Sequence, residues 1–503
     1  MPRRLIDGLR NLSVCAIPLL LSGCVGTAGI TPRTTPAAVE HWVGDAAIAQ
    51  AQVAAHWPRE QWWRGYGDRQ LDQWVERAVR DSPSLATAAA RIRQAEALAG
   101  SAEASEALQV QGRARLERHD WPADQFYGPG ELAGARTWDN QAGLGFSYAL
   151  DLWGRERAST ARALSLAQRS VAQARQAQLE LTHNVVRAYV QLSLHFAQRE
   201  VAEAHLAQQA QLLELARHRL QGGLGTQLEV SQAQTALPDL HRQLDALDER
   251  IALDRNQLAA LAGQGPAAGA TLQRPHLRPG PALALPGRLP AQLLGQRPDV
   301  VAARWNVAAQ ARGLEAAQAA FYPNVDLLGS LGYMATGGGL LTFLAGKKLA
   351  YDVGPAVSLP LFDGGRLRGQ LGVAAADYDL AVAAYDDTLI QALNSISNQL
   401  IRRESLARQT QLAGQGLASA QRTCDLAEQA YRRGLADYSS VLQAQTQLFA
   451  QQRIAQNLQA AELLAYAGLA TALGGGLGAG DEVPGRAELA APPLPASLAV
   501  FGR

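Results

Sequence analysis

The sequence predicts a mixed fold in which long α-helical coiled-coil hairpins are joined to four amphipathic strands of a membrane β-barrel. Three observations support this prediction. The landmarks of the chain occur twice, each copy opens on an extended segment with alternating apolar and polar residues, and each then runs into a very long helix. Gly434-Leu435 follows Gly223-Leu224 by 211 positions, for example. A duplication of this size indicates two copies of one structural unit.

The amino terminus has the features of a lipoprotein signal peptide. Three arginines precede an apolar run at residues 14–21, which is too short to span a bilayer. The run ends in Leu21-Ser22-Gly23-Cys24, which resembles the lipobox of bacterial lipoproteins. We therefore expect removal of residues 1–23, lipidation of Cys24 with acyl chains such as palmitate, and a lipid-anchored linker over residues 24–56. Valine rather than aspartate follows Cys24, which implies sorting to the outer membrane.

Two strands are predicted in each copy. They cover about residues 109–118 and 140–152 in the first copy and about 324–333 and 351–361 in the second. Strict alternation places Leu144 and Phe146 on an apolar face and Arg113 and Arg115 on a polar face. Strands of roughly ten residues match those that cross a bilayer. A soluble sheet with one wet face is the alternative for any single strand.

Four strands cannot close a barrel, and an open sheet edge is not tolerated in hydrocarbon. Several chains must then share one barrel. Two chains would give eight strands and an interior filled by side chains, whereas three would give twelve strands and a wider lumen. The wider lumen favours a trimer, in which Arg113 and Arg115 would face the barrel lumen.

The helical rod of the first copy covers residues 155–221, which contain neither glycine nor proline and are rich in strong helix formers. At ~1.5 Å per residue it would be ~100 Å long. Apolar residues recur at steps of seven from Leu164 to Leu220, which is typical of a coiled coil. A helix in an ordinary bundle is the alternative. The rod turns at glycines and returns, which predicts helical hairpins over residues 155–262 and 366–473.

The predicted copies cover residues 57–262 and 297–473. Residues 263–296, rich in proline and glycine, are expected to form an irregular equatorial linker, and residues 474–503 a tail. With 46 Lys and Arg against 45 Asp and Glu, the formal charge is +1, so no nucleic acid partner is expected. No phosphate-binding loop, zinc-protease motif or hydrolase elbow is present. We expect neither an enzyme nor a cofactor or metal site.

Five motifs give the chain a specific family resemblance, which covers roughly residues 57–473. They are Trp62-Trp63 with Gly67-Asp68 and Leu71, Leu150-Asp151-Leu152-Trp153-Gly154-Arg155, Arg297-Pro298-Asp299-Val300, Pro360-Leu361-Phe362-Asp363-Gly364-Gly365-Arg366 and Tyr431-Arg432-Arg433-Gly434-Leu435. With these motifs the chain resembles the TolC-like outer-membrane efflux factors, specifically the lipoprotein branch that serves resistance-nodulation-division (RND) pumps.

The resemblance implies a homotrimer with a barrel in the outer membrane and a tunnel of helical hairpins in the periplasm. Such a duct would passively conduct drugs or other small molecules from an inner-membrane RND pump and a periplasmic adaptor to the cell exterior. The outer duct of a type I protein-secretion system has the same fold and is the main alternative. A lipid-anchored stalk without conduction is a third hypothesis.

The resemblance also implies that the hairpin turns form a periplasmic tip that opens and closes. We expect Gly223 at the first turn, and Arg432, Arg433 and Asp437 at the second. Gln443 stands where the family often carries an aspartate, so Asp437 is the carboxylate nearest the turn. Three copies of Asp437 clustered on the axis would act as a gate. Alternatively, Asp437 caps the returning helix.

Overall fold

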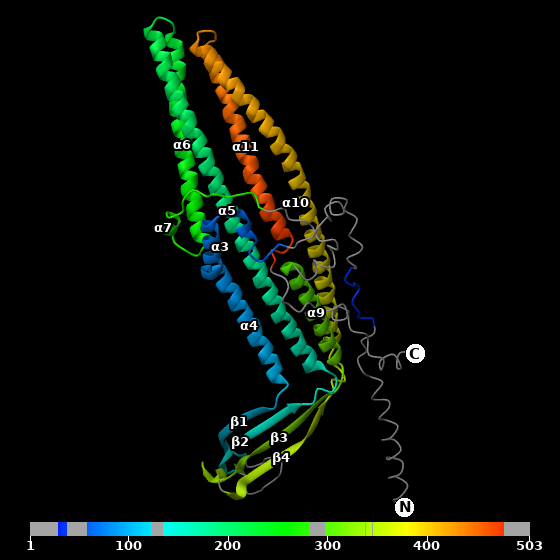
Figure 1. Cartoon of the computed structure of the whole chain (residues 1–503). Helices are drawn as coiled ribbons and strands as arrows, with labels where there is room; N and C mark the ends of the chain where they lie inside the picture. The colour runs from blue at the N-terminus through cyan, green and yellow to red at the C-terminus, as the bar shows by residue number, and fades with distance from the viewer. Residues whose placement is uncertain are drawn as a thin grey trace, which may run out of the picture.

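The computed structural model describes residues 29–37, 58–122, 134–280, 297–337, 339–344 and 346–476. The molecule is a long helical rod with a small β-sheet at one end and two helical turns at the other (Figure 1). The predicted signal peptide, Cys24 and most of the predicted linker over residues 24–56 lie outside the described residues, as do residues 477–503 of the predicted tail.

Two helical hairpins form most of the rod. The first consists of α5 (Arg155–Gln221) and α6 (Gln227–Leu261), and the second consists of α10 (Arg366–Arg432) and α11 (Tyr438–Ala472). Each long helix has 67 residues and each returning helix has 35. The equal lengths agree with the duplication read from the sequence, and each long helix spans ~100 Å.

The prediction that each copy opens on an extended segment is wrong, because helices precede the strands. α3 (Arg69–Asp81) and α4 (Pro83–Ser105) precede the first pair of strands, and α9 (Pro298–Ala319) precedes the second. α4 and α9 each begin with proline. Proline is favoured there because a backbone N–H in the first turn of a helix has no intrahelical partner, so its absence costs nothing. Both helices are rich in alanine and present no sharp apolar stripe, and so the apolar period that reveals helices is weak in them. Both pack along α5.

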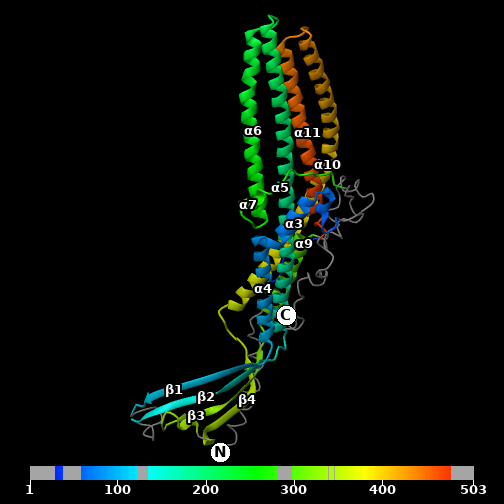
Figure 2. The same ribbon diagram turned by 60° about the vertical axis from the view of Figure 1, so that its left-hand side comes forward.

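The strands form one antiparallel sheet, whose order along the chain is also its order in space (Figure 2). They are β1 (Gln109–Asp120), β2 (Arg136–Ala149), β3 (Asn324–Thr336) and β4 (Leu349–Ser358). β1 and β3 continue beyond their predicted ends, whereas β2 and β4 end three residues earlier than predicted. After β2 the backbone N–H of Leu150 still donates to the carbonyl of Val325 in β3, and the backbone N–H of Leu152 then donates to the carbonyl of Leu150. β1 and β4 are the edge strands.

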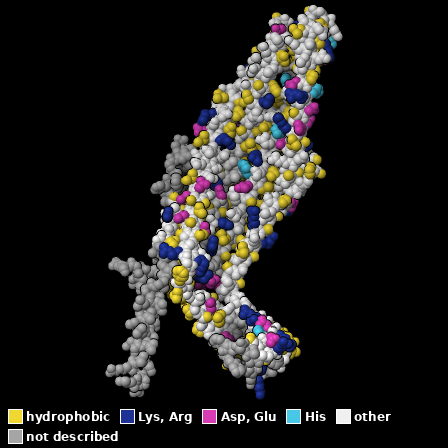
Figure 3. Space-filling view, turned by 180° about the vertical axis from the view of Figure 1, so that it is seen from behind, with side chains coloured by type: hydrophobic (Ala, Val, Ile, Leu, Met, Phe, Trp, Pro, Cys, Tyr) yellow, Lys and Arg dark blue, Asp and Glu magenta, His cyan; other side chains and the backbone are white. Residues whose placement is uncertain are grey.

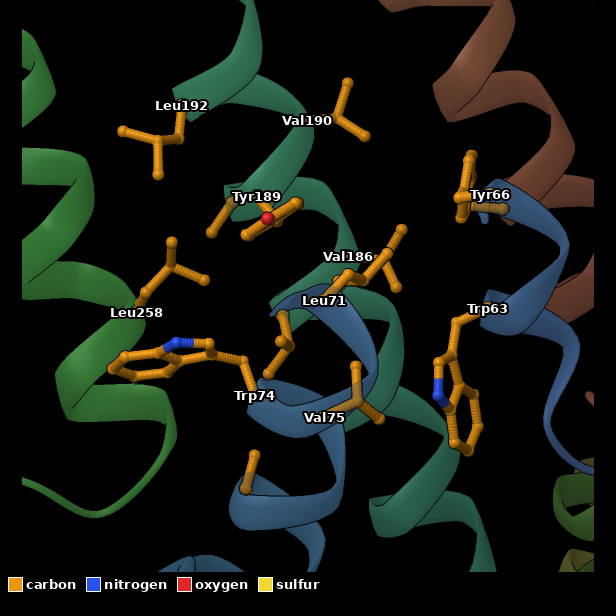
Figure 4. Packing of buried hydrophobic residues seen from close by; sticks show 14 of the residues in the cluster. Trp63, Tyr66, Leu71, Trp74, Val75, Val186, Tyr189, Val190, Leu192 and Leu258 are labelled. Carbon is orange, nitrogen blue, oxygen red and sulfur yellow. The ribbon is translucent and has the colours of Figure 1, made fainter. Parts of the chain in front are cut away.

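A buried aromatic core holds the middle of the rod together (Figure 4). Trp74 of α3 and Tyr189 of α5 are both buried in it. Asp68 begins α3 and accepts hydrogen bonds from the Tyr189 hydroxyl at 3.0 Å and from the backbone N–H of His276 at 2.8 Å. Burial raises the pKa of Tyr189, so its hydroxyl stays a neutral donor. One carboxylate therefore joins α3, α5 and the linker between the copies.

The segment between the copies contains one regular element. α7 (Pro266–Gly269) is a single helical turn, so the prediction of a wholly irregular linker is wrong there. Gly269 is needed at its end, since a Cβ would lie 2.3 Å from the carbonyl oxygen of Arg255. Residues 281–296 of the predicted linker lie outside the described residues.

Candidate functional site

The pairing register places apolar side chains of all four strands on one face of the sheet. Leu144 lies opposite Gly112 on one side and Leu331 on the other, and Leu331 lies opposite Tyr351. Directly paired residues point to the same side, so these residues form a row across the sheet. Leu144 is 47% exposed and Tyr351 is 78% exposed. Phe146 shares this face, which we call the apolar face.

The opposite face of the sheet is polar. Arg113 and Arg115 lie on it, because side chains alternate along a strand and Arg113 is paired with the neighbour of Leu144. Arg115 Nε lies 2.6 Å from Glu117 Oε1, and the hydroxyl of Ser330 donates to the carboxylate of Asp352. A hollow of about 770 Å³ is lined in part by Arg113, Ser330 and Asp352. The structure thus brings the two arginines together on one polar surface.

Two glycines bring β2 and β3 into close approach on this polar face. A Cβ at Gly143 would lie 2.7 Å from both the Cα of Gly332 and the carbonyl oxygen of Leu331. A Cβ at Gly332 would lie 2.6 Å from the Cα of Gly143. No side chain fits at either position, so the glycine pair allows the sheet to curl toward its polar side.

Aromatic side chains lie near both ends of the sheet. At the end next to the helices, the Trp153 ring stacks on Tyr322 with centroids 4.6 Å apart, and its indole N–H donates to the carbonyl of Pro323 at 2.8 Å. At the free end, the Arg118 guanidinium lies 5.7 Å from the centre of the Trp138 ring. An apolar band between two aromatic girdles is typical of strands that cross a membrane.

The two hairpin turns at the other end of the rod share one backbone design. Gly223 and Gly434 have φ angles of 71° and 75°, in the left-handed region that favours glycine. Thr226 and Asp437 then cap the returning helices through their side-chain oxygens. Gly223 therefore lies at a turn, as predicted, and the sequence pattern of glycine followed by a cap residue was a usable signal.

The helix cap considered for Asp437 is present in the structure. Its Oδ1 accepts hydrogen bonds from the Ser440 hydroxyl at 2.7 Å, the Ser439 hydroxyl at 2.9 Å and the Ser440 backbone N–H at 3.1 Å. The bond from the Ser440 hydroxyl, followed by that from Ser439, lowers the pKa of Asp437. The exposed carboxylate is therefore ionised at neutral pH.

The other predicted tip residues surround this turn. Arg432 ends α10, and its Nη2 lies 3.6 Å from Glu428 Oε2 in the preceding turn. Arg433 is the exposed C-terminal cap residue of α10. Gln443 is exposed on α11, six positions after Asp437. These residues lie near one end of the rod, but Gln443 is separated from the turn by more than one helical turn.

A contact between the two hairpins near their turns was missed in the sequence. The Arg219 guanidinium of α5 lies 4.6 Å from the centre of the Tyr431 ring, and its Nη1 donates to the Tyr431 carbonyl at 2.9 Å. The Tyr431 hydroxyl donates to Glu229 Oε2 at 3.4 Å. Burial, followed by the nearby Glu229 carboxylate, raises the pKa of Tyr431 to about 12. We call these three residues the tip contact.

A second polar connection lies just below the tip contact. The Glu428 carboxylate of α10 accepts hydrogen bonds from the amides of Gln208 on α5 and Gln445 on α11. Cys424, one turn earlier, is buried, and this burial raises the pKa of its thiol to about 11. Both connections join residues more than 200 positions apart, and no local pattern marks such pairs.

The short described segment at the amino terminus lies against α10. Asp379 accepts hydrogen bonds from the backbone N–H groups of Arg33 and Thr34, both at 3.0 Å, and from the Thr34 hydroxyl at 2.7 Å. Two turns further along α10, Asp386 accepts from the backbone N–H of Ala37 at 3.1 Å. Burial opposes ionisation of Asp379, but the bonds from Thr34 and Arg33 together lower its pKa.

In the described ranges, no helix is long and apolar enough to cross a membrane. No group of three or more His, Cys, Asp and Glu side chains in this part of the chain is arranged to hold a metal ion.

The profile of the family described as "Outer membrane efflux protein" matches residues 74–264 and 289–475, which correspond to the two copies of the repeat. The chain belongs to this family. The match also explains the lack of catalytic motifs, since the family consists of membrane efflux proteins rather than enzymes.

Individual relatives of this outer membrane efflux protein include curated proteins and solved structures. The fusaric acid resistance protein FusA of Burkholderia cepacia is 47% identical over 369 residues, which cover 73% of this chain and 70% of FusA. The pyoverdine export outer membrane protein OpmQ of Pseudomonas aeruginosa is 30% identical, with 93% of this chain and 97% of OpmQ covered.

Among the solved structures, the outer membrane protein VceC of Vibrio cholerae superimposes with a TM-score of 0.77 at 35% identity, covering 83% of this chain and 99% of VceC. The outer-membrane channel OprN gives a TM-score of 0.77 at 26% identity, covering 90% of this chain and 99% of OprN. The efflux protein therefore shares the fold of known outer-membrane channels, as the family resemblance implied.

Proposed function

We propose that the chain is the outer-membrane duct of a tripartite efflux pump and that it works as a homotrimer. The open four-stranded sheet carries this proposal. Its exposed apolar face suits contact with lipid. Its two edge strands, β1 and β4, have unpaired backbone groups, which are not stable in a bilayer unless further copies complete the barrel. Three copies would give twelve strands and a lumen lined by Arg113 and Arg115.

The proposed partners follow from the length of the rod and from the relatives. Helices of ~100 Å extend far from the sheet, and if the sheet crosses the outer membrane, the turns would lie deep in the periplasm. There an adaptor protein would connect them to an inner-membrane RND pump. FusA confers fusaric acid resistance and OpmQ exports pyoverdine, as their names state. We therefore favour small organic molecules over proteins as the exported substrates.

Conductance and drug susceptibility test this proposal together. The purified full-length chain should produce discrete conductance steps in a planar bilayer, whereas a structural stalk would produce none. Deletion of the gene should lower the concentration of fusaric acid that inhibits growth, and the intact gene should restore it. A strain that keeps its resistance but loses secretion of a protein substrate would instead identify a type I secretion duct.

We also propose that Cys24 is lipidated and anchors the chain to the outer membrane. The described residues 29–37 support this, because their attachment to α10 fixes the chain a few residues after Cys24. Cys24→Ala should abolish labelling with radioactive palmitate yet leave some barrel assembly, since the strands carry their own apolar face. Labelling that persists on the variant would refute the lipobox interpretation.

Finally, we propose that the tip residues Gly223, Arg432, Arg433, Asp437 and Gln443 form the periplasmic gate. Asp437→Asn is a sharp test, because asparagine caps a helix as well as aspartate does but carries no charge. We expect altered block of the conductance by divalent cations and unchanged thermal stability. Asp437→Ala, which removes both the charge and the cap, is the matched variant. If divalent cations block the Asp437→Asn channel as they block the wild type, Asp437 acts only as a helix cap and not as part of a gate.

A further inference from the structure

The free end of the sheet carries basic residues on its apolar face. Arg118 is paired with Trp138, and Asp120 is paired with Arg136. Alternation along β2 places Trp138 and Arg136 on the same face as Leu144. In the space-filling view, dark blue side chains lie at this end of the sheet together with magenta ones and one histidine (Figure 3). Within these pairs, Arg136 Nε lies 3.0 Å from Asp120 Oδ2, and the Arg118 guanidinium stacks over Trp138.

Two lysines add to this charge. Lys347 and Lys348 lie in η4 (Gly346–Lys348), directly before β4, and both are exposed. The first residue of β4, Leu349, is paired with Tyr333, whose side chain lies on the apolar face. The two lysines therefore lie next to the apolar face, at the start of edge strand β4.

Apart from Asp120, the carboxylates of this region lie on the polar face. Glu117 is paired with Asp139, and both belong to the polar face. Their neighbours there are Arg115, whose Nε lies 2.6 Å from Glu117, and His119, whose Nε2 lies 3.2 Å from it. At the free end, the apolar face thus carries Arg118, Arg136 and Asp120, and Lys347 and Lys348 lie directly before its edge strand β4, whereas Glu117 and Asp139 lie on the polar face.

Part of the loop between β3 and β4 folds over the same face. Asn140 is on the apolar face, yet it is only 2% exposed, because its Nδ2 donates to the carbonyl of Leu340 at 2.8 Å. Phe343 in η3 (Thr342–Leu344) is also buried. Leu341 remains 65% exposed and Leu344 52% exposed. Apolar side chains and lysines of one loop are therefore presented side by side.

We propose that Arg118, Arg136, Lys347, Lys348, Leu341 and Leu344 form a binding surface for phosphate-bearing lipids of the outer leaflet. This proposal rests on the proposed function, since it requires the sheet to cross the outer membrane. The helices leave the sheet at its opposite end, so the free end would face the cell exterior (Figure 1). The four basic residues would bind headgroup phosphates, while the two leucines would contact acyl chains.

General physical chemistry supports this ligand class. Basic side chains near an anionic membrane surface each strengthen binding, and guanidinium and ammonium groups form charge-assisted hydrogen bonds with phosphate oxygens. Cations at the rim of the apolar band avoid the cost of burial at the bilayer midplane. Free phosphate would use the same cations but would gain nothing from Leu341 and Leu344.

Lipid binding by the purified full-length protein in detergent micelles tests the proposal. The probe is bisphosphorylated lipid A, compared with the same lipid after removal of both phosphates. Lys347→Gln/Lys348→Gln should weaken binding of the bisphosphorylated form by about tenfold or more, since each cation contributes on the order of 1 kcal/mol at a membrane surface. Arg113→Gln/Arg115→Gln removes the same charge from the polar face and should leave lipid binding unchanged.

Three results would overturn the proposal. They are equal affinity for the two lipid forms, equal loss of binding in the two double variants, and full displacement of the lipid by millimolar inorganic phosphate. Conductance of the same preparations in a planar bilayer separates this proposal from the proposed function. A wild-type protein that conducts but does not prefer phosphorylated lipid refutes the lipid surface alone, whereas a wild-type protein that never conducts refutes the duct.

Discussion

Leu144→Arg should prevent most of the protein from assembling in the outer membrane. Leu144 lies near the middle of β2 and is exposed on the apolar face. An arginine on the lipid side of a barrel costs ~2–4 kcal/mol near the bilayer midplane. Each copy in the proposed trimer would bear this cost, so we expect a large drop in the folded oligomer seen on semi-native gels of outer membranes.

The adjacent residue provides the matched control. Gly145 is on the polar face, where a Cβ would meet nothing closer than 3.9 Å, and it is paired with Ser330, the partner of Asp352. Gly145→Arg introduces the same charge next to a carboxylate and should assemble normally. Normal assembly of Leu144→Arg together with failure of Gly145→Arg would show that the faces are inverted.

Gly143→Val should also disrupt the sheet, but by steric conflict. The new Cβ would lie 2.7 Å from the Cα of Gly332, and backbone atoms cannot move aside as the end of a flexible side chain can. Overpacking of this kind costs about 1–3 kcal/mol, and more where the backbone cannot shift. The expected result is a lower melting temperature of the oligomer, measured by loss of the β-sheet signal on heating.

Gly354→Val is the control for this change. Gly354 also lies on the polar face, but a Cβ there would meet no atom within 4 Å. Valine favours strands, so this variant should be at least as stable as the wild type. Equal destabilisation by both variants would contradict the role of the close approach between β2 and β3.

Much of this architecture was predictable because it is local. The alternation that separated Leu144 and Phe146 from Arg113 and Arg115 is a property of each strand alone, and the pairing register preserves it across the sheet. Each hairpin turn likewise follows from a few neighbouring residues, with glycine at Gly223 or Gly434 for the left-handed conformation and a polar cap after it.

The features that were missed depend on tertiary contacts. α4 and α9 were not predicted, because alanine-rich helices packed in a bundle need no sharp apolar stripe and so lack the periodic pattern that marks a helix. The seven-residue series suggested that Leu164 packs in a seam, yet it is half exposed in the single chain. The tip contact joins Arg219 to Tyr431 across 212 positions, and only the packing of α5 beside the second hairpin creates it.

The unpaired edges of the sheet have a consequence for genetics. The barrel of the proposed trimer has three seams, and every chain contributes its β1 edge to one seam and its β4 edge to another, so a defect in one copy interrupts the strand pairing of the whole barrel. A cell that makes equal amounts of a sound chain and a chain defective in β1 or β4 would build only about one duct in eight from sound chains alone. Alleles that damage an edge strand would therefore behave as dominant, whereas alleles that prevent the chain from being made would be recessive.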